Sequence, residues 1–261
     1  MKQKTSELLL YLKLITILAL PAIFISWYSF YDKELTIAGV TLEKTDIAGY
    51  FKKGPTVPTI QQAIDSQKDP IICDTTSQRI LFFGDSMLEG LSRRMKQYAA
   101  ANHHELLNVI WYSSSSKVWA EHKDTLVRFI NEFHPTYIMI CMGGNELFVK
   151  DLENRDRYVK TILRTLGSTP YVWIGPPNWK EDAGINRIYC DNAGAHRFFP
   201  SKRLKYQRKS DGAHPTYASA AMWMDSVAVW MNDSIRHRIL MKMPAKDAPS
   251  TGKTVLLQPL K

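Results

Sequence analysis

Short apolar runs alternate with segments of helical periodicity through the middle of this chain, and this alternation limits its fold more than any other feature. The runs lie at residues 79–84, 106–112, 137–142 and 171–174. The segments between them carry apolar residues three or four positions apart, which is the spacing of an amphipathic helix. Continuous apolar strands joined by helices are typical of a mostly parallel sheet covered on both faces. The sequence therefore predicts an α/β fold of three layers, α/β/α.

The remaining elements of this predicted fold follow the same pattern. Helices are expected at residues 87–101, 119–133, 151–166, 182–193 and 215–231, and a short further strand at residues 197–199. In sheets of this class the ligand site lies beyond the carboxyl ends of the strands. The loops that follow the apolar runs are therefore expected to meet at one edge of the sheet.

The N-terminal segment has a different character. Leu14–Tyr31 carries no charge, is about as long as a bilayer-spanning helix, and follows Lys2, Lys4 and Lys13, which favour a cytoplasmic N-terminus. A cleaved signal peptide is the alternative, but the run lacks a small-x-small cleavage site and ends in aromatic residues typical of the membrane interface. We expect an uncleaved single-pass anchor, which places the rest of the chain in the periplasm or outside the cell.

This organisation divides the chain into four predicted segments. They are a cytoplasmic tip and transmembrane anchor at residues 1–34, a membrane-proximal spacer at 35–76 with a short helix near 60–66, a main domain at 77–242 and a flexible tail at 243–261. With 261 residues, 45% of them hydrophobic, the chain can bury one good-sized core.

The charge and the cysteines exclude several classes of function. The formal net charge of +9 suggests nucleic-acid binding as one function. No nucleic-acid motif accompanies the lysines, however, and an exported domain meets anionic lipids and glycans instead. Cys73, Cys141 and Cys190 are too few for a disulfide framework and have no metal-ligand spacing. Cys141 is expected as a buried thiol, whereas an oxidising compartment would permit Cys73 and Cys190 to pair. We expect no metal, no cofactor and no nucleic-acid partner.

The first apolar run ends in Gly84, Asp85 and Ser86, and a helical pattern begins at Met87. This order puts Ser86 on a strand-to-helix turn at the carboxyl edge of the predicted sheet. Backbone N–H groups at the start of a helix point towards a negative group beside them, so the turn is suited to stabilising an oxyanion. Gly-Asp-Ser is also ordinary turn and N-cap chemistry. A catalytic role for Ser86 therefore depends on partner residues elsewhere in the chain.

Asp211 precedes His214 by three residues, in a short loop before the last predicted helix. A base must reach the hydroxyl that it activates, and a carboxylate on the same loop can orient its imidazole. Capping or packing is the alternative role for a lone histidine. Because several turns of this kind fall at one predicted sheet edge, the sequence favours a nucleophile, a base and an orienting carboxylate at Ser86, His214 and Asp211.

Three blocks of the chain resemble those of the SGNH, or GDSL, hydrolase superfamily, in that superfamily's order. They are Gly84-Asp85-Ser86, Gly143-Gly144-Asn145-Glu146 and Asp211-Gly212-Ala213-His214. The similarity covers roughly residues 79–231 and implies a flavodoxin-like sheet. It also implies a role for each of four residues: nucleophile and oxyanion N–H donor for Ser86, base for His214, orienting carboxylate for Asp211, and side-chain oxyanion donor for Asn145.

The chain departs from the superfamily in the block that normally offers a glycine N–H after the second strand. The corresponding loop is Tyr112–Lys117, which contains four serines and no glycine. We expect Ser114 or Ser115 to present its backbone N–H instead. Glu146 stands where aspartate is common, which is a milder change.

The residues and the resemblance together predict a serine acyl-ester enzyme with an acyl-serine intermediate. It is an esterase if water resolves that intermediate and an O-acetyltransferase if a sugar hydroxyl does. The sequence around Ser86 does not fit Gly-x-Ser-x-Gly, so the nucleophile elbow of the α/β-hydrolases is not supported. A phosphate-binding loop and a Gly-x-Gly-x-x-Gly motif after a strand are also absent from the sequence.

The expected substrate is a cell-envelope carbohydrate ester. Trp179 lies at the predicted active edge and Trp119 beside the serine loop, where each could stack on a sugar ring or pack in the core. The basic run at residues 202–209 could attract an anionic polysaccharide or be a solvated loop. An anchored extracytoplasmic SGNH-like domain resembles proteins that add or remove acetyl groups on envelope glycans, sometimes beside a multispanning acyl donor.

Two further functions stay open from the sequence. A non-catalytic glycan-binding or assembly protein would keep the same fold, and the missing second-block glycine favours this alternative. A lipid or thioester hydrolase would keep the same triad and would need an apolar acyl channel beside it.

Overall fold

The computed structural model describes residues 36–37, 40–41 and 73–260. The predicted anchor and the short helix predicted near residues 60–66 lie outside the described residues. Among the residues that are described, no helix has both the length and the apolar character needed to cross a bilayer.

The chain divides into two compact units, Met1–Asp69 and Pro70–Lys261. In the first unit, β1 (Thr36–Ile37) pairs antiparallel with β2 (Val40–Thr41). The second unit contains the main sheet and the two hydrophobic cores on its faces.

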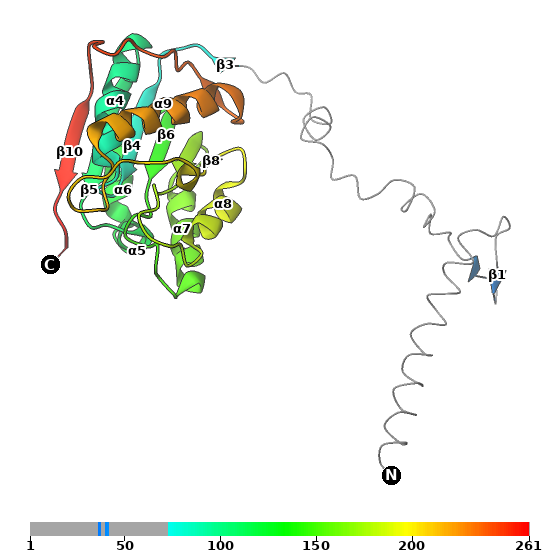
Figure 1. The fold of residues 1–261 in the computed structure, drawn as a ribbon. Coiled ribbons are helices and arrows are strands. Elements are labelled where there is room, and N and C mark those ends of the chain that lie inside the picture. The colour runs from blue at the N-terminus through cyan, green and yellow to red at the C-terminus, as the bar shows by residue number, and fades with distance from the viewer. Residues whose placement is uncertain (1–35, 38–39, 42–72, 261) are drawn as a thin grey trace. The chain divides into compact units, whose positions relative to one another are not determined.

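A six-stranded sheet, in which all neighbouring strands are parallel, forms the centre of the second unit (Figure 1). Its strands, in spatial order, are β10 (Lys253–Leu257), β5 (Glu105–Trp111), β4 (Arg79–Gly84), β6 (Tyr137–Cys141), β7 (Tyr171–Ile174) and β8 (Phe198–Phe199). The chain order reverses at β4, because β5 lies on one side of it and β6 on the other. A separate parallel pair is formed by β3 (Cys73–Asp74) and β9 (Arg238–Ile239).

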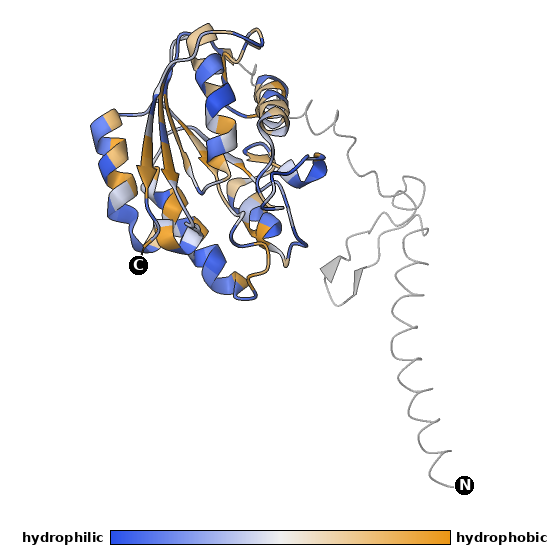
Figure 2. Ribbon diagram, turned by 60° about the vertical axis from the view of Figure 1, so that its left-hand side comes forward, coloured by the Kyte–Doolittle hydropathy of each residue, from blue (hydrophilic) through white to orange (hydrophobic). Residues whose placement is uncertain are grey.

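Helices cover both faces of the sheet, which confirms the three predicted layers. One face is covered by α4 (Leu88–Ala101) and α9 (Tyr217–Asp233). The other is covered by α5 (Ser116–Glu121), α6 (Lys123–Phe133), α7 (Leu152–Thr165) and α8 (Ile185–Ala193). A 3-10 helix, η1 (Ser201–Arg203), follows β8. Figure 2 shows the hydrophobic strands between helices of mixed hydropathy.

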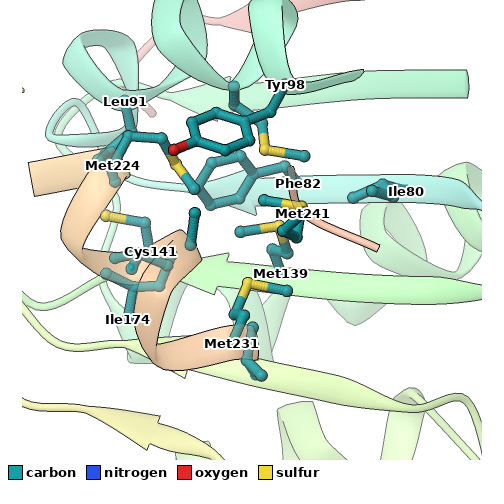
Figure 3. Packing of buried hydrophobic residues seen from close by; sticks show 14 of the residues in the cluster. Ile80, Phe82, Leu91, Tyr98, Met139, Cys141, Ile174, Met224, Met231 and Met241 are labelled. Carbon is teal, nitrogen blue, oxygen red and sulfur yellow. The ribbon is translucent and has the colours of Figure 1, made fainter. Parts of the chain in front are cut away.

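The central strand β4 explains why the strands appear in the sequence as continuous apolar runs. Ile80 and Phe82 pack into the core beneath α4 and α9, while Leu81 and Phe83 pack into the core on the opposite face. Successive side chains of a strand point to opposite faces, so a strand covered on both sides needs apolar residues at every position. Figure 3 shows the core beneath α4 and α9, in which Phe82 lies among side chains of α4, α9 and β6.

The register brings the carboxyl ends of five strands to one level. Gly84 of β4 is opposite Ile110 of β5 and Cys141 of β6. Cys141 is opposite Ile174 of β7, which is in turn opposite Phe199 of β8. The loops that follow these strands therefore leave the sheet at the same edge, as the sequence predicted.

The single helix predicted at residues 119–133 is wrong. The chain forms α5 and α6 there, and they are separated at His122, whose φ of −107° and ψ of 41° are not helical. The first helix begins earlier than predicted because the Ser115 hydroxyl caps it by accepting a bond from the Val118 N–H. Apolar spacing continues across the break, so periodicity alone could not reveal it.

The flexible tail predicted at residues 243–261 is wrong for the segment that forms β10. This strand pairs with β5 along its whole length, from Lys253 opposite Leu107 to Leu257 opposite Trp111. Val255 and Leu257 pack against the core on the face covered by α5 to α8. Its five residues are mostly exposed, as expected of an edge strand. Because the strand is short and follows a polar, proline-containing segment, the sequence there resembles a flexible tail.

All three cysteines lie in the described part of the chain and are free thiols. Cys141 is buried, as predicted, and its burial raises the pKa of its thiol. The suggested bond between Cys73 and Cys190 is not formed.

Candidate active site

A close approach between two strands requires the glycine that precedes the serine turn. A Cβ atom on Gly84 would lie 1.7 Å from the carbonyl oxygen of Cys141 in β6. No side chain fits at that distance, so any substitution would push β4 and β6 apart. Gly84 thereby lets the turn that carries Ser86 sit directly against the loop after β6.

Asp85 ties the Ser86 turn to that neighbouring loop. Its carboxylate is fully buried and accepts hydrogen bonds of 2.9 Å from three backbone N–H groups, those of Met87, Gly143 and Gly144. Burial raises the pKa of Asp85 to about 6, although the three N–H bonds act in the opposite direction. Asp85 is therefore a structural link between two loops of the site and does not face solvent.

A small antiparallel closure positions the loop that carries the histidine. The Lys209 N–H donates to the His214 carbonyl and the Thr216 N–H donates to the Gln207 carbonyl, both at 2.8 Å. Arg208 and Pro215 form the antiparallel bridge between these bonds. The turn between them holds His214 at the start of α9.

Asp211 fixes both the backbone and the imidazole of this turn. Its Oδ1 accepts the N–H groups of Ala213 and His214 at 2.9 Å, and its Oδ2 lies 2.8 Å from His214 Nδ1. The two backbone bonds, followed by the imidazole bond, lower the pKa of Asp211 to about 2. Because an ionised carboxylate only accepts hydrogen bonds, Nδ1 must carry a proton, which leaves His214 Nε2 free to act as an acceptor.

The three residues predicted to form a triad are together in the structure. His214 Nε2 lies 2.9 Å from Ser86 Oγ, so hydrogen bonds run without interruption from Ser86 through His214 to Asp211. The side chains of His214 and Asp211 are 32% and 47% exposed, which leaves the histidine accessible from solvent. This arrangement can move a proton from the serine hydroxyl to the imidazole.

The serine loop between β5 and α5 distinguishes between the two predicted oxyanion donors. The N–H of Ser114 donates to the Trp111 carbonyl at 3.2 Å, so the prediction for Ser114 is wrong. The N–H groups of Ser115 and Ser86 have no acceptor in the described part of the chain. Asn145 Nδ2 donates to the Ser114 carbonyl at 2.9 Å, which holds its amide beside the loop and leaves one N–H of that amide for a ligand.

The buried side chain of Glu146 holds the end of this serine loop in place. Its buried carboxylate accepts bonds from the Ser116 N–H at 2.8 Å and the Ser116 hydroxyl at 2.7 Å, and it also accepts the Tyr189 hydroxyl. Arg155 Nη1 lies 3.1 Å from Glu146 Oε1, which gives the buried carboxylate a counter-ion. The residue next to Asn145 therefore fixes the first residue of α5, one position after Ser115.

Arg208 holds the histidine turn against the loop after β7. Its guanidinium donates to the carbonyl of Ala213 and to the carbonyls of Pro177 and Asn178, the last two at 2.9 and 2.6 Å. In the sequence Arg208 is one member of a basic run and has no separate role. No pattern there marks it, because its partners are backbone carbonyls from distant loops.

The two tryptophans predicted to contact substrate have different environments. Trp119 is completely buried and donates its indole N–H to Ser114 Oγ, so the prediction that it contacts substrate is wrong. Trp179 is partly exposed and donates its indole N–H to the Gly144 carbonyl at 2.9 Å. Gly144 precedes Asn145, so Trp179 lies beside the loop after β6 that carries Asn145, the predicted oxyanion donor.

Among the described residues, a further cavity and the metal-ligating side chains also bear on where a ligand could bind. A pocket of about 650 Å³ lies between α8, β8 and α9, and its lining includes none of Ser86, Asp211 and His214. Within the described residues, no three His, Cys, Asp or Glu side chains are grouped as metal ligands would be.

Fold and site together define an α/β protein with a hydrogen-bonded Ser–His–Asp chain at the carboxyl edge of its sheet. No protein-family model matches the sequence, and no curated protein matches it at a significant level.

Proposed function

We propose that this chain is a serine-dependent acyl-ester enzyme of the SGNH type, an O-acetyl esterase or O-acetyltransferase that acts on cell-envelope carbohydrate. The observation that carries the proposal is the pair of hydrogen bonds from Ser86 Oγ to His214 and from His214 to Asp211. A serine with a base at 2.9 Å, whose base is in turn oriented by a carboxylate, has the geometry of an activated nucleophile.

Each side chain then has one task in acyl transfer. His214 Nε2 takes the Ser86 proton as Oγ bonds to the acyl carbon, and the carbonyl electrons move to oxygen to form a tetrahedral oxyanion. When the oxyanion collapses, the ester C–O bond breaks, and His214 gives its proton to the departing sugar oxygen. Asp211 keeps the proton on Nδ1 and stabilises the imidazolium. Water or a sugar hydroxyl repeats these steps on the acyl-serine.

Three donors are available for the oxyanion. They are the N–H groups of Ser86 and Ser115 and the remaining amide proton of Asn145. Donors fixed before the reaction stabilise developing charge without reorganising, which is usually the largest electrostatic contribution to catalysis. The unengaged N–H of Ser115 supplies what the superfamily's second-block glycine provides, so it favours an enzyme over the non-catalytic glycan-binding alternative.

The location of Ser86 supports the proposal independently. The strand order β5-β4-β6-β7-β8 is that of a flavodoxin-like sheet, in which ligands bind where the order reverses. The reversal falls at β4, and Ser86 follows β4 by two residues. The lipid or thioester alternative needs an apolar acyl channel beside the triad, and the pocket between α8, β8 and α9 is not that channel, because its lining includes none of the triad.

The carbohydrate substrate and the cellular setting are part of the same proposal. Trp179 offers a partly exposed aromatic ring beside the oxyanion loop, which suits the apolar face of a sugar. The uncharged segment Leu14–Tyr31 favours a membrane-anchored enzyme whose domain faces the cell envelope, where a multispanning protein could supply acyl groups.

Labelling with a serine-directed fluorophosphonate tests the proposed activity. The full-length chain should gain one adduct by intact mass, and Ser86→Ala and His214→Ala should abolish it. Ser210→Ala removes an exposed serine beside Asp211 and should label normally. A folded protein that gains no adduct, or an adduct that persists in Ser86→Ala, would refute the proposed nucleophile.

A further inference from the structure

Two groups of cationic and aromatic side chains adjoin the Ser86 site and have no part in the acyl-transfer steps. The first, here called the Trp179 group, consists of Phe148, Trp179 and Lys180. The rings of Phe148 and Trp179 meet edge to face, with centroids 5.9 Å apart. Lys180 Nζ lies 4.9 Å from the Trp179 ring and 5.7 Å from the Phe148 ring. Phe148 is 55% exposed, so its ring can contact a ligand from solvent.

The second group, here called the Tyr217 group, consists of Arg93, Lys209 and Tyr217. Arg93 Cζ lies 4.3 Å and Lys209 Nζ 4.7 Å from the centroid of the Tyr217 ring. Tyr217 is 53% exposed, so its ring keeps two cations together at the surface.

Hydrogen bonds attach both groups to the catalytic loops. Trp179 Nε1 donates to the carbonyl of Gly144, the residue before Asn145. The Lys209 N–H donates to the carbonyl of His214, the proposed base. The Trp179 group therefore adjoins the oxyanion loop and the Tyr217 group adjoins the histidine turn.

The cations of both groups have no acidic partner among the described residues. Arg93, Lys180 and Lys209 all lie beyond ion-pair distance from every carboxylate there, whereas Lys202 pairs with Asp182 at 3.6 Å. Unpaired cations held over exposed rings beside a reactive serine keep their attraction for an anionic ligand. The net charge of +9 adds a long-range attraction of the same sign.

We propose that the two groups bind an acidic glycan, so that the ester cleaved or formed at Ser86 belongs to a polysaccharide carrying carboxylate or phosphate groups. The reaction at Ser86 rests on the proposed function, whereas binding at these groups can be measured without it. The rings of Phe148 and Trp179 cover the apolar face of a sugar, and Arg93, Lys180 and Lys209 attract its negative charges.

A binding experiment tests this proposal without turnover. Full-length Ser86→Ala is titrated at low salt with O-acetylated oligogalacturonate and with the same oligomer whose carboxylates are reduced to alcohols before acetylation. An acetylated phosphomannan and its dephosphorylated form make the same comparison for phosphate. At least one acidic probe should bind about thirty-fold more tightly than its neutral counterpart, and added salt should remove the difference.

Variants in the Ser86→Ala background locate the binding. Arg93→Gln, Lys180→Gln and Lys209→Gln should each weaken acidic-probe binding about three-fold, and the triple variant roughly thirty-fold. Phe148→Ala should weaken both acidic and neutral probes. Lys246→Gln is the matched control, because it removes an exposed lysine whose carbonyl binds Gln97 near the far end of α4.

Three outcomes would overturn the inference. They are equal affinity for acidic and neutral forms of both polymers, no binding of any probe, and a loss in Lys246→Gln as large as that in Lys180→Gln. In any of these cases, if the fluorophosphonate labels Ser86 of the unmodified protein, the proposed serine enzyme stands and only its acidic substrate is rejected.

Discussion

The Arg208 guanidinium donates a hydrogen bond to the carbonyl of Ala213, the residue immediately before the proposed base. The same guanidinium bonds the carbonyls of Pro177 and Asn178 in the loop after β7. One side chain thus joins the turn that carries His214 to a loop fixed by the sheet. The planar guanidinium of arginine has five N–H donors and can bond several carbonyls at once, so the ammonium group of lysine cannot replace it fully.

Arg208→Lys should therefore lower kcat about ten-fold with little change in KM, since small displacements of a catalytic group are costly. Hydrolysis of 4-nitrophenyl acetate measures the effect, and thermal unfolding shows whether the fold is kept. Arg203→Lys, in the same basic run, is the control and should behave as the unmodified protein. Equal kcat in the two variants would show that Arg208 does not position His214.

Substitutions at Asn145 and Ser115 separate the side-chain from the backbone contribution to the proposed oxyanion site. Asn145→Ala removes the amide that faces the site and should lower kcat by about 10²-fold to 10³-fold. Ser115→Ala keeps the backbone N–H and removes only the cap of α5, so it should cost about 1 kcal/mol of stability and leave kcat within a few-fold. Steady-state kinetics and urea unfolding of both variants test this. A large loss of kcat in Ser115→Ala would assign the hydroxyl a direct role.

The pKa of Asp211 makes a prediction about acid stability. The hydrogen bonds of the folded state lower it to about 2, from 3.8 for the free group, so the folded protein binds this proton less tightly than the unfolded chain. The resulting stabilisation is complete above pH 4 and is lost as the pH falls through 2. Asp211→Asn lacks it at every pH.

Urea unfolding of the two proteins between pH 5 and pH 2 measures this contribution. The difference in free energy of unfolding between the unmodified protein and Asp211→Asn should shrink as the pH falls. Comparing the two proteins removes the effect of Asp85, whose raised pKa of about 6 gives the opposite trend. A difference that is constant with pH would show that Asp211 does not hold these bonds in solution.

Much of the fold and the triad could be predicted because they depend on local patterns. Strands β4, β5, β6 and β7 are buried on both faces, so each appears in the sequence as a nearly continuous run of apolar residues. The Ser86 turn follows from Gly84, and the spacing of Asp211 and His214 places both on one loop. Because the strands are parallel, the two loops lie at the same edge of the sheet, and no additional sequence pattern is needed to predict this.

The features that could not be predicted depend on contacts between distant segments. Trp119 could be assigned to the surface or the core, and only the packing of α5 against the sheet buries it. Glu146 differs from the expected aspartate in length, and its partners Ser116, Arg155 and Tyr189 come from three helices, α5, α7 and α8. In neither case does the surrounding sequence indicate the partner.

The edge strand β10 provides the last prediction, because it links the C-terminal segment to the serine loop. The Trp111 indole N–H donates to the Gln258 carbonyl at 2.9 Å, and the Tyr112 N–H donates to the Leu257 carbonyl at 3.0 Å. Both donors lie at the end of β5, where the serine loop begins. A chain that ends after Ser250 loses these bonds and uncovers the whole edge of β5.

We expect this truncation to lower the free energy of unfolding by about 2 kcal/mol, from the lost burial of Val255 and Leu257. The exposed edge should also promote self-association, because unpaired strand groups are a template for another chain. A chain that ends after Gln258 keeps β10 and is the matched control. Urea unfolding and light scattering compare the two. If both truncations match the full chain in stability and in kcat, β10 contributes to neither the sheet nor the serine loop in solution.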